Sequence, residues 1–89
     1  RGDLDEAMRL FGEALEINKR LGSLEGQAIQ LGNMGLVAQT RGDLDEARRL
    51  WDEALGLFTK IGAKPQIEQT ERLLASLDSP SPPQGGDKT

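Results

Sequence analysis

Cysteine, histidine and tyrosine are absent from this chain of 89 residues, and its aromatic residues are one tryptophan and two phenylalanines. Histidine and tyrosine commonly act as general acids and bases, cysteine as a nucleophile, and cysteine and histidine as zinc ligands. No glycine-rich phosphate loop of defined spacing is present either. The sequence therefore predicts no catalytic residue, no metal site and no cofactor, and we do not expect an enzyme.

An excess of positive charge and a long apolar run are also missing. The net charge is -4, and lysine and arginine alternate with aspartate and glutamate, which leaves no basic patch for nucleic-acid phosphates. No apolar stretch approaches the roughly 20 residues that cross a bilayer. We therefore expect neither nucleic acid nor a membrane as a partner. The absence of cysteine is compatible with a reducing compartment, so the expected location is the cytoplasm.

What the chain does contain is an internal repeat. Residues 1–7 return unchanged as residues 41–47, with the sequence Arg-Gly-Asp-Leu-Asp-Glu-Ala. Further residues match in the same register, namely Arg9-Leu10 with Arg49-Leu50, Phe11 with Trp51, Glu13-Ala14-Leu15 with Glu53-Ala54-Leu55, and Gly22 with Gly62. A unit of about 40 residues that repeats is typical of stacked arrays that bind partners. Because the chain opens inside a unit and without methionine, we expect it to be part of a longer protein.

Apolar residues at spacings of three and four predict helices and no strands. The expected helices cover residues of about 3–21, 24–40, 44–61 and 65–77. Asp43 with Glu46 fits a capping box at the start of the third helix, and Asp3 with Glu6 repeats it at the first. Residues 78–89 are rich in proline, serine and glycine, which predicts a flexible tail or linker.

Small and bulky residues alternate along the inward faces of these helices. The small ones are Gly35, Ala38, Ala47 and Ala54, and the bulky ones beside them are Leu31, Met34, Leu50, Trp51 and Leu55. Short side chains let neighbouring helices approach while large ones fill the space beside them, which predicts antiparallel helix hairpins. Stacked hairpins and a closed four-helix bundle both satisfy this pattern, and the exact repeat favours the stack.

The order of these residues resembles the tetratricopeptide repeat. The pattern consists of Leu31, Met34-Gly35, Ala38, Gly42-Asp43, Ala47, Trp51 and Ala54. Residues 1–21 resemble only the second helix of such a unit and residues 65–77 only the first, with Ala75 where Gly35 stands. The period is longer than that of the commonest unit and is similar to the subgroup found in kinesin light chains and bacterial regulatory proteins. The resemblance implies an all-α fold, a short right-handed solenoid of four helices that serves as a protein-interaction scaffold.

In arrays of that family, the first helix of each pair lines a concave groove. This implies partner-binding roles for one stripe of the second helix, Ile29, Asn33, Leu36 and Thr40, and for the matching stripe of the last helix, Gln69, Arg72 and Ser76. Asn33 stands where the family often has an asparagine that contacts the backbone of a bound peptide, and its amide can donate and accept together. Leu73 stands at the equivalent position of the last helix, so no second clamp is expected there. A merely solvated polar face is the alternative.

Two functions remain open at this point. The first is an interaction module that binds a protein or peptide ligand in its groove. The second is a structural segment that self-associates through exposed repeat ends, because about two units are fewer than the three that such arrays usually need. Asn33→Ala is expected to weaken a groove ligand only, whereas a charge at Leu74 or Leu77 on the terminal helix is expected to weaken assembly only.

Overall fold

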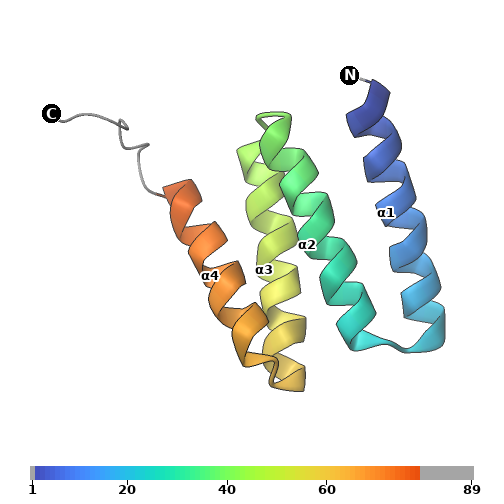
Figure 1. Ribbon diagram of the computed structural model, residues 1–89, viewed down its shortest axis with the longest axis vertical. Coiled ribbons are helices and arrows are strands. Elements are labelled where there is room, and N and C mark those ends of the chain that lie inside the picture. Colours follow the sequence, from blue (N-terminus) through green and yellow to red (C-terminus); the bar gives the residue numbers. More distant parts are fainter. Residues whose placement is uncertain (1, 79–89) are drawn as a thin grey trace, which may run out of the picture.

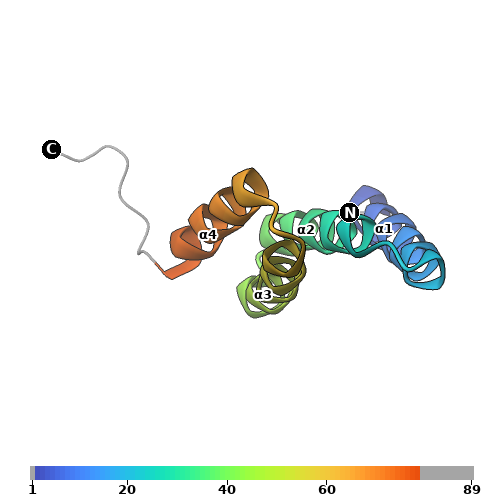
Figure 2. The ribbon, with the colours of Figure 1, turned by 90° about the horizontal axis from the view of Figure 1, so that it is seen from below.

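A computed structural model describes residues 2–78 as four helices that pack in an open row (Figure 1). These are α1 (Gly2–Leu21), α2 (Leu24–Thr40), α3 (Leu44–Ile61) and α4 (Lys64–Asp78). Each helix packs antiparallel against the next one along the chain, while α1 and α4 lie at opposite ends of the row (Figures 1 and 2). The predicted all-α stack of four helices is confirmed, and the closed bundle is not, because closure would bring α1 against α4.

The predicted tail falls largely outside the residues that the structure describes, since only Asp78 lies within them, as the last residue of α4. None of the four helices combines the length and the apolar composition that a bilayer-spanning helix requires. No strand occurs in residues 2–78.

Three glycines close the hairpins between these helices, Gly22 (φ 74), Gly42 (φ 84) and Gly62 (φ 71). A positive φ is strained for other residues, so the regular placement of glycine sets where each helix ends. Two of the helices that follow these glycines, α2 and α3, start with a side-chain cap. Ser23 accepts a hydrogen bond from the Gly26 N–H (3.0 Å), and Asp43 accepts one from the Glu46 N–H (3.4 Å). Short capped turns force successive helices to run antiparallel.

Two details of the predicted caps are wrong. Asp3 lies inside the first turn of α1, which begins at Gly2. At the start of α3, the Asp43 N–H donates to the Ala38 carbonyl (2.8 Å) and not to Glu46. The Glu46 carboxylate instead accepts from the Arg49 guanidinium (2.7 Å), and this hydrogen bond lowers the pKa of Glu46. An arginine three residues along the helix therefore competes successfully with the backbone for this carboxylate.

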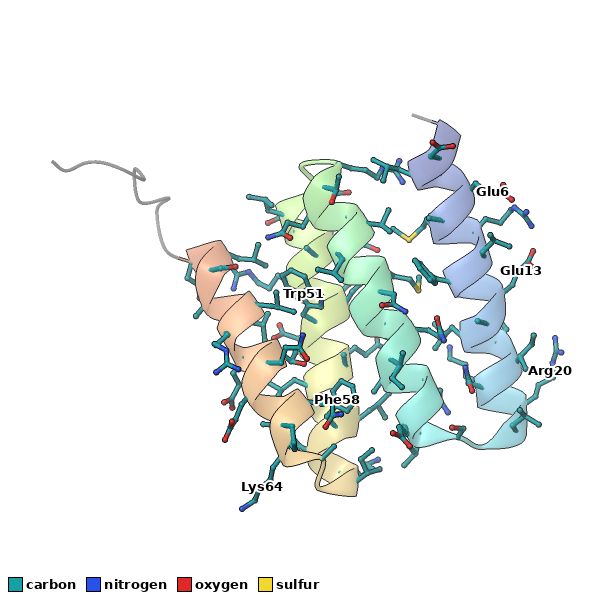
Figure 3. All side chains as sticks on the ribbon, viewed as in Figure 1. Glu6, Glu13, Arg20, Trp51, Phe58 and Lys64 are labelled. Carbon is teal, nitrogen blue, oxygen red and sulfur yellow. The ribbon has the colours of Figure 1, made fainter. Side chains whose placement is uncertain are left out.

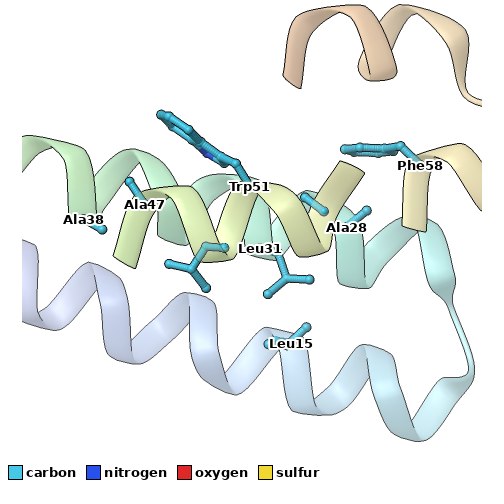
Figure 4. Packing of buried hydrophobic residues seen from close by; sticks show 9 residues of the cluster. Leu15, Ala28, Leu31, Ala38, Ala47, Trp51 and Phe58 are labelled. Carbon is cyan, nitrogen blue, oxygen red and sulfur yellow. The ribbon is translucent and has the colours of Figure 1, made fainter. Parts of the chain in front are cut away.

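The contact between α2 and α3 holds the best buried part of the core. Trp51 and Leu50 of α3 are 0% and 1% exposed, and they pack among small or aliphatic residues of both helices (Figure 4). The Trp51 indole N–H donates to the Gly32 carbonyl of α2 (3.1 Å). A Cβ atom at Gly35 would lie 2.2 Å from that same indole nitrogen. The packed position of the Trp51 ring therefore requires glycine at residue 35, as the alternation of small and bulky residues predicts.

Helix α4 ends the described row with a polar outer face. Leu74 and Leu77 are partly buried and pack against the core, and their role in self-association stays a prediction. The positions of α2 that face α3 are Ala28, Leu31 and Ala38, and one repeat later they are occupied by Glu68, Glu71 and Asp78. These three acidic residues are exposed, and Asp78 forms an ion pair with Arg48 of α3. Because α3 is the main helix that α4 packs on within residues 2–78, the apolar stripe of α4 turns inward and its carboxylates face solvent.

Candidate functional site

Helices α2 and α4 run in the same direction on one side of α3 (Figures 1 and 2). A groove of about 160 Å³ lies between them. Ten residues from three helices line it: Ala28, Ile29, Gly32, Asn33, Leu36, Phe58, Gln66, Gln69, Thr70 and Leu73. The groove follows from the fold, because α2 and α4 both pack on α3 and make little contact with each other.

The floor of the groove is well buried and largely apolar. Phe58 is 6% exposed and lies on the side of α3 that faces α4, as Figures 3 and 4 show. Ala28 of α2 is fully buried beside it. Thr70 of α4 is 5% exposed, and its hydroxyl donates to the Gln66 carbonyl (2.8 Å), so its proton is already satisfied within the helix. These residues belong to well-packed helices and hold the groove open without a loop.

Large apolar side chains form much of the walls. Ile29 and Leu36 of α2 lie two helical turns apart, and their side chains are 43% and 44% exposed. Leu73 of α4 is half-buried in the opposite wall. A single exposed leucine is ordinary on a protein surface, but several apolar residues that converge on one groove mark a binding surface.

Three primary amides complete the groove, from Asn33 on α2 and from Gln66 and Gln69 on α4. Within residues 2–78, none of these three side chains forms a hydrogen bond to another protein group. Each amide carries two N–H donors and a carbonyl acceptor. None of the ten lining residues has a side chain that ionises near neutral pH, so the groove is uncharged.

The structure brings four of the seven predicted site residues together in this groove, namely Ile29, Asn33, Leu36 and Gln69. Thr40 is exposed at the end of α2, and its hydroxyl donates to the Leu36 carbonyl (2.9 Å). Arg72 and Ser76 are exposed on α4 and lie outside the groove lining, and the Ser76 hydroxyl donates to the Leu73 carbonyl (2.6 Å). A role in binding stays a prediction for all seven.

Sequence reasoning missed five lining residues, namely Ala28, Gly32, Phe58, Gln66 and Thr70, whereas it had placed Leu73 on the stripe of the last helix without a binding role. On α4 the reason is geometric. Shifting the α2 stripe by one repeat selects Gln69, Leu73 and Ser76. The opposite wall of the groove is formed by the face of α4 that turns back toward α2, which includes Gln66 and leaves out Ser76 and Arg72. That face carries Gln66, Gln69 and Leu73. For the floor of the groove, the sequence did contain a signal: Phe58 is apolar, whereas its counterpart in the first copy is the polar Asn18.

A larger hollow of about 360 Å³ opens on the other face, between α1 and α3. Its lining is Leu15, Lys19, Gln27, Leu31, Asp52, Glu53, Gly56, Leu57 and Lys60. Leu15 and Leu31 are 8% and 4% exposed, so the core already covers them, and the rim is made of opposite charges. Size alone favours this hollow. We take the groove between α2 and α4 as the candidate site because exposed apolar side chains and three amides with no hydrogen bond within residues 2–78 converge there.

The charged clusters of the molecule lie outside this groove. In α1, Arg9 binds the carboxylates of Glu6 and Glu13 at 2.6 Å each, and Arg49 repeats this arrangement in α3. The hydrogen bond from Arg9 lowers the pKa of Glu6. Exposed pairs of this kind contribute little to stability and offer no special chemistry. Within residues 2–78, no three carboxylates are arranged so that they could hold a metal ion.

Comparison with known families identifies both copies of the repeat. The sequence model described as tetratricopeptide repeat matches residues 1–21 and 28–60, which include α1 and most of α2 and α3. Comparisons with curated proteins and with solved structures find no match.

Proposed function

The chain belongs to the tetratricopeptide repeat family, and from this premise we propose that it is an interaction module that holds a segment of a partner protein in the groove between α2 and α4. Repeats of this family serve as scaffolds for protein-protein interaction. The observation that carries the proposal is the groove itself, where exposed Ile29 and Leu36 lie beside the unpaired amides of Asn33 and Gln69.

The size of the groove supports a peptide segment over a small molecule. Sites that enclose a ligand of drug size usually measure roughly 300 to 1,000 Å³. The groove measures about 160 Å³, which is room for one or two side chains of a longer ligand. A segment that lies along the groove also covers the exposed parts of Ile29 and Leu36, and apolar burial contributes about 25 cal/mol per Å².

Residues beyond the groove extend the proposed site. Thr40, Arg72 and Ser76 lie near its end on α2 and α4, where they are exposed to solvent. We assign to Arg72 a contact with an acidic group of the partner outside the groove, because its guanidinium has no ion pair within residues 2–78. Thr40 and Ser76 keep acceptor capacity on their hydroxyl oxygens.

A random peptide library displayed against the immobilised chain tests this function. We expect enriched peptides, and we expect Asn33→Ala to weaken the best of them about 5- to 20-fold in calorimetry, because a peptide group then loses its partner. Leu36→Ala should weaken it as well through lost apolar contact. Leu57→Ala is the matched control, since Leu57 lines the hollow on the other face. Weaker binding for Leu57→Ala with normal binding for Asn33→Ala would place the site in that hollow and contradict the proposal.

The finer family placement is also a proposal. The period of about 40 residues supports the longer-repeat subgroup that resembles kinesin light chains and bacterial regulatory proteins. From it we infer a regulatory or scaffolding role within a larger protein, and a cytoplasmic location fits such a role.

Self-association is a second candidate, and a separate observation favours it. Leu10, Ile17 and Leu21 form a stripe along α1 and are 49%, 50% and 74% exposed. Two of their counterparts in α3, Leu50 and Leu57, lie in the core or pack against it, whereas the third, Ile61, is 39% exposed. Most of the stripe on α1 therefore matches a surface that is packed in α3. Size-exclusion chromatography with light scattering, carried out over a concentration series, tests this role. We expect a larger species at high concentration that Leu10→Glu abolishes, and a strict monomer throughout would contradict it.

A further inference from the structure

We infer that the groove holds an extended, uncharged peptide by both edges of its main chain, with Asn33 on one wall and Gln66 and Gln69 on the other. This inference rests on the proposed function and adds to it the conformation of the ligand, the charge of its inserted side chains and the role of the two glutamines. At the position equivalent to Asn33, α4 has Leu73, which cannot hydrogen-bond. The amides that replace it lie on the neighbouring turns of α4 and line the same groove.

The placement of the three amides suits a peptide chain that passes between them. Asn33 projects from α2, whereas Gln66 and Gln69 project from α4, so donors and acceptors stand on opposite walls. Residues three apart on a helix share a face, about 4.5 Å apart along the axis. Peptide groups on one edge of an extended chain recur every two residues, about 6.6 Å apart. The flexible side chains of two glutamines can cover this difference, so α4 is able to hold two successive peptide groups.

The unpaired amides favour an extended ligand over a helical one. A helix uses its own N–H and C=O groups along its whole length, apart from its ends. A helix in the groove would therefore leave Asn33, Gln66 and Gln69 covered without main-chain partners, which costs free energy for each polar group that loses water. An extended chain has free N–H and C=O groups along both edges and satisfies both walls.

The floor of the groove agrees with this conformation. Successive side chains of an extended chain point in opposite directions, so alternate residues enter the groove and the others face solvent. Phe58 and Ala28 provide an apolar floor, and the volume of about 160 Å³ admits one or two side chains. The inserted residues of the ligand are therefore apolar and lie two positions apart.

The uncharged lining sets a further limit on the ligand. A carboxylate or ammonium group in the groove would lose hydration and find no opposite charge among the ten lining residues. Lys64 and Arg72 of α4 are exposed and lie outside the lining. Binding at the inserted positions therefore excludes acidic and basic side chains, and the contribution of these positions to affinity stays constant with salt and between about pH 5 and pH 9.

The experiment uses the peptide most enriched from the random library, acetylated and amidated at its ends, together with the full chain and three variants. Gln66→Met and Gln69→Met remove the amides at nearly equal helix propensity, and Gln27→Met is the matched control because Gln27 lines the hollow on the opposite face. Circular dichroism checks that each variant is folded. We expect each groove variant to weaken binding about 2- to 10-fold and the control to leave it unchanged.

N-methylation along the peptide assigns each edge. Methyl groups at alternate residues block N–H groups on a single edge. N-methyl groups on one edge of the peptide should weaken binding to the wild-type chain, and this loss should be smaller in Gln66→Met or Gln69→Met. N-methyl groups on the other edge should also weaken binding to the wild-type chain, and that loss should be smaller in Asn33→Ala. Such coupling supports two-edged binding.

The outcomes separate this inference from the proposed function. If the peptide binds and Asn33→Ala weakens it, but both glutamine variants bind as wild type does, the second edge is not held and the inference is overturned while the proposed function stands. Tighter binding by a helix-stabilised peptide, or by a peptide with glutamate or lysine at the inserted positions, also overturns the inference alone. If no peptide is enriched, or Asn33→Ala has no effect on any enriched peptide, the proposed function fails with it.

Discussion

Leu10 and Leu50 occupy the same position in two copies of one sequence, yet Leu10 is 49% exposed and Leu50 is 1% exposed. Eight of the nine residues that precede them are identical, and the exception is Met8, which is Arg48 in the second copy. Both leucines lie in helices, so the local sequence forms a helix in each copy. The difference arises because α3 packs against α2 and α4, whereas within residues 2–78 α1 packs against α2 alone.

This comparison separates two kinds of information in a repeated sequence. Helix formation and termination depend on neighbours along the chain, and both copies share them. Burial depends on neighbours in space, and these differ between α1 and α3. We therefore expect substitutions that act through packing to differ between the copies, and substitutions that act through local helix stability to agree.

The largest difference is expected for the two leucines. Leu50→Ala removes buried volume and should lower the free energy of unfolding by about 2 to 5 kcal/mol. Leu10→Ala should lower it by about 1 kcal/mol or less, because half of that side chain already lies in solvent. Urea titrations followed by circular dichroism measure both. Equal losses would mean that α1 is packed as closely as α3 and would break the comparison.

A smaller effect is expected at the contact of Gly35 with Trp51. The first copy has Phe11 in place of the tryptophan, and α4 has Ala75 in place of the glycine. Gly35→Ala should cost about 1 to 3 kcal/mol because the new Cβ atom meets the indole ring. In a Trp51→Phe background the same change should cost less, since the five-membered ring is gone. A double-mutant cycle measures this coupling, and strict additivity would contradict the packing argument.

Local helix stability should give equal and still smaller effects. Gly12 in α1 and Gly56 in α3 each lie inside a helix, and a Cβ atom added at either one meets nothing within 4 Å. Gly12→Ala and Gly56→Ala should each raise the free energy of unfolding by about 0.5 to 1 kcal/mol. Thermal unfolding measures both variants. A gain in only one copy would show that spatial neighbours matter even here.

The smallest effects are expected for the exposed arginines. Arg9→Gln and Arg49→Gln remove equivalent ion pairs, and neither should change the unfolding midpoint measurably at neutral pH. The pKa of Glu6 and that of Glu46 are lowered from 4.5 by their arginines, so any stabilisation is present above that pH and is lost as the pH falls through the lowered pKa. Unfolding curves at about pH 7 and pH 3 test this sign. A wild-type advantage that appears only in acid would contradict it.

The sequence was sufficient to predict the helices and their order, because the signals are local. Glycine breaks, caps and apolar spacing recur in each copy, and Gly35 beside Trp51 is visible as a pairing of small with bulky residues. The error at Asp43 has a local cause too, since a prediction from capping preference did not weigh Arg49 as a competitor for Glu46.

The groove was only partly predictable, because its two walls belong to different repeats. Asn33 and Leu36 were accessible from the stripe pattern of one helix, as was Gln69 from the matching stripe. Gln66 was not, because its place in the groove depends on how far α4 is rotated toward α2. Likewise, the inward turn of Leu74 depends on α3 being the main neighbour of α4 within the described residues.

The most direct test of the central claim is an NMR titration that follows side-chain amide signals while the enriched peptide is added. The account predicts that the signals of Asn33, Gln66 and Gln69 shift together and saturate at one peptide per chain, while the signal of Gln27 on the opposite face stays in place. Shifts at Gln27 with no change at the three groove amides would contradict it.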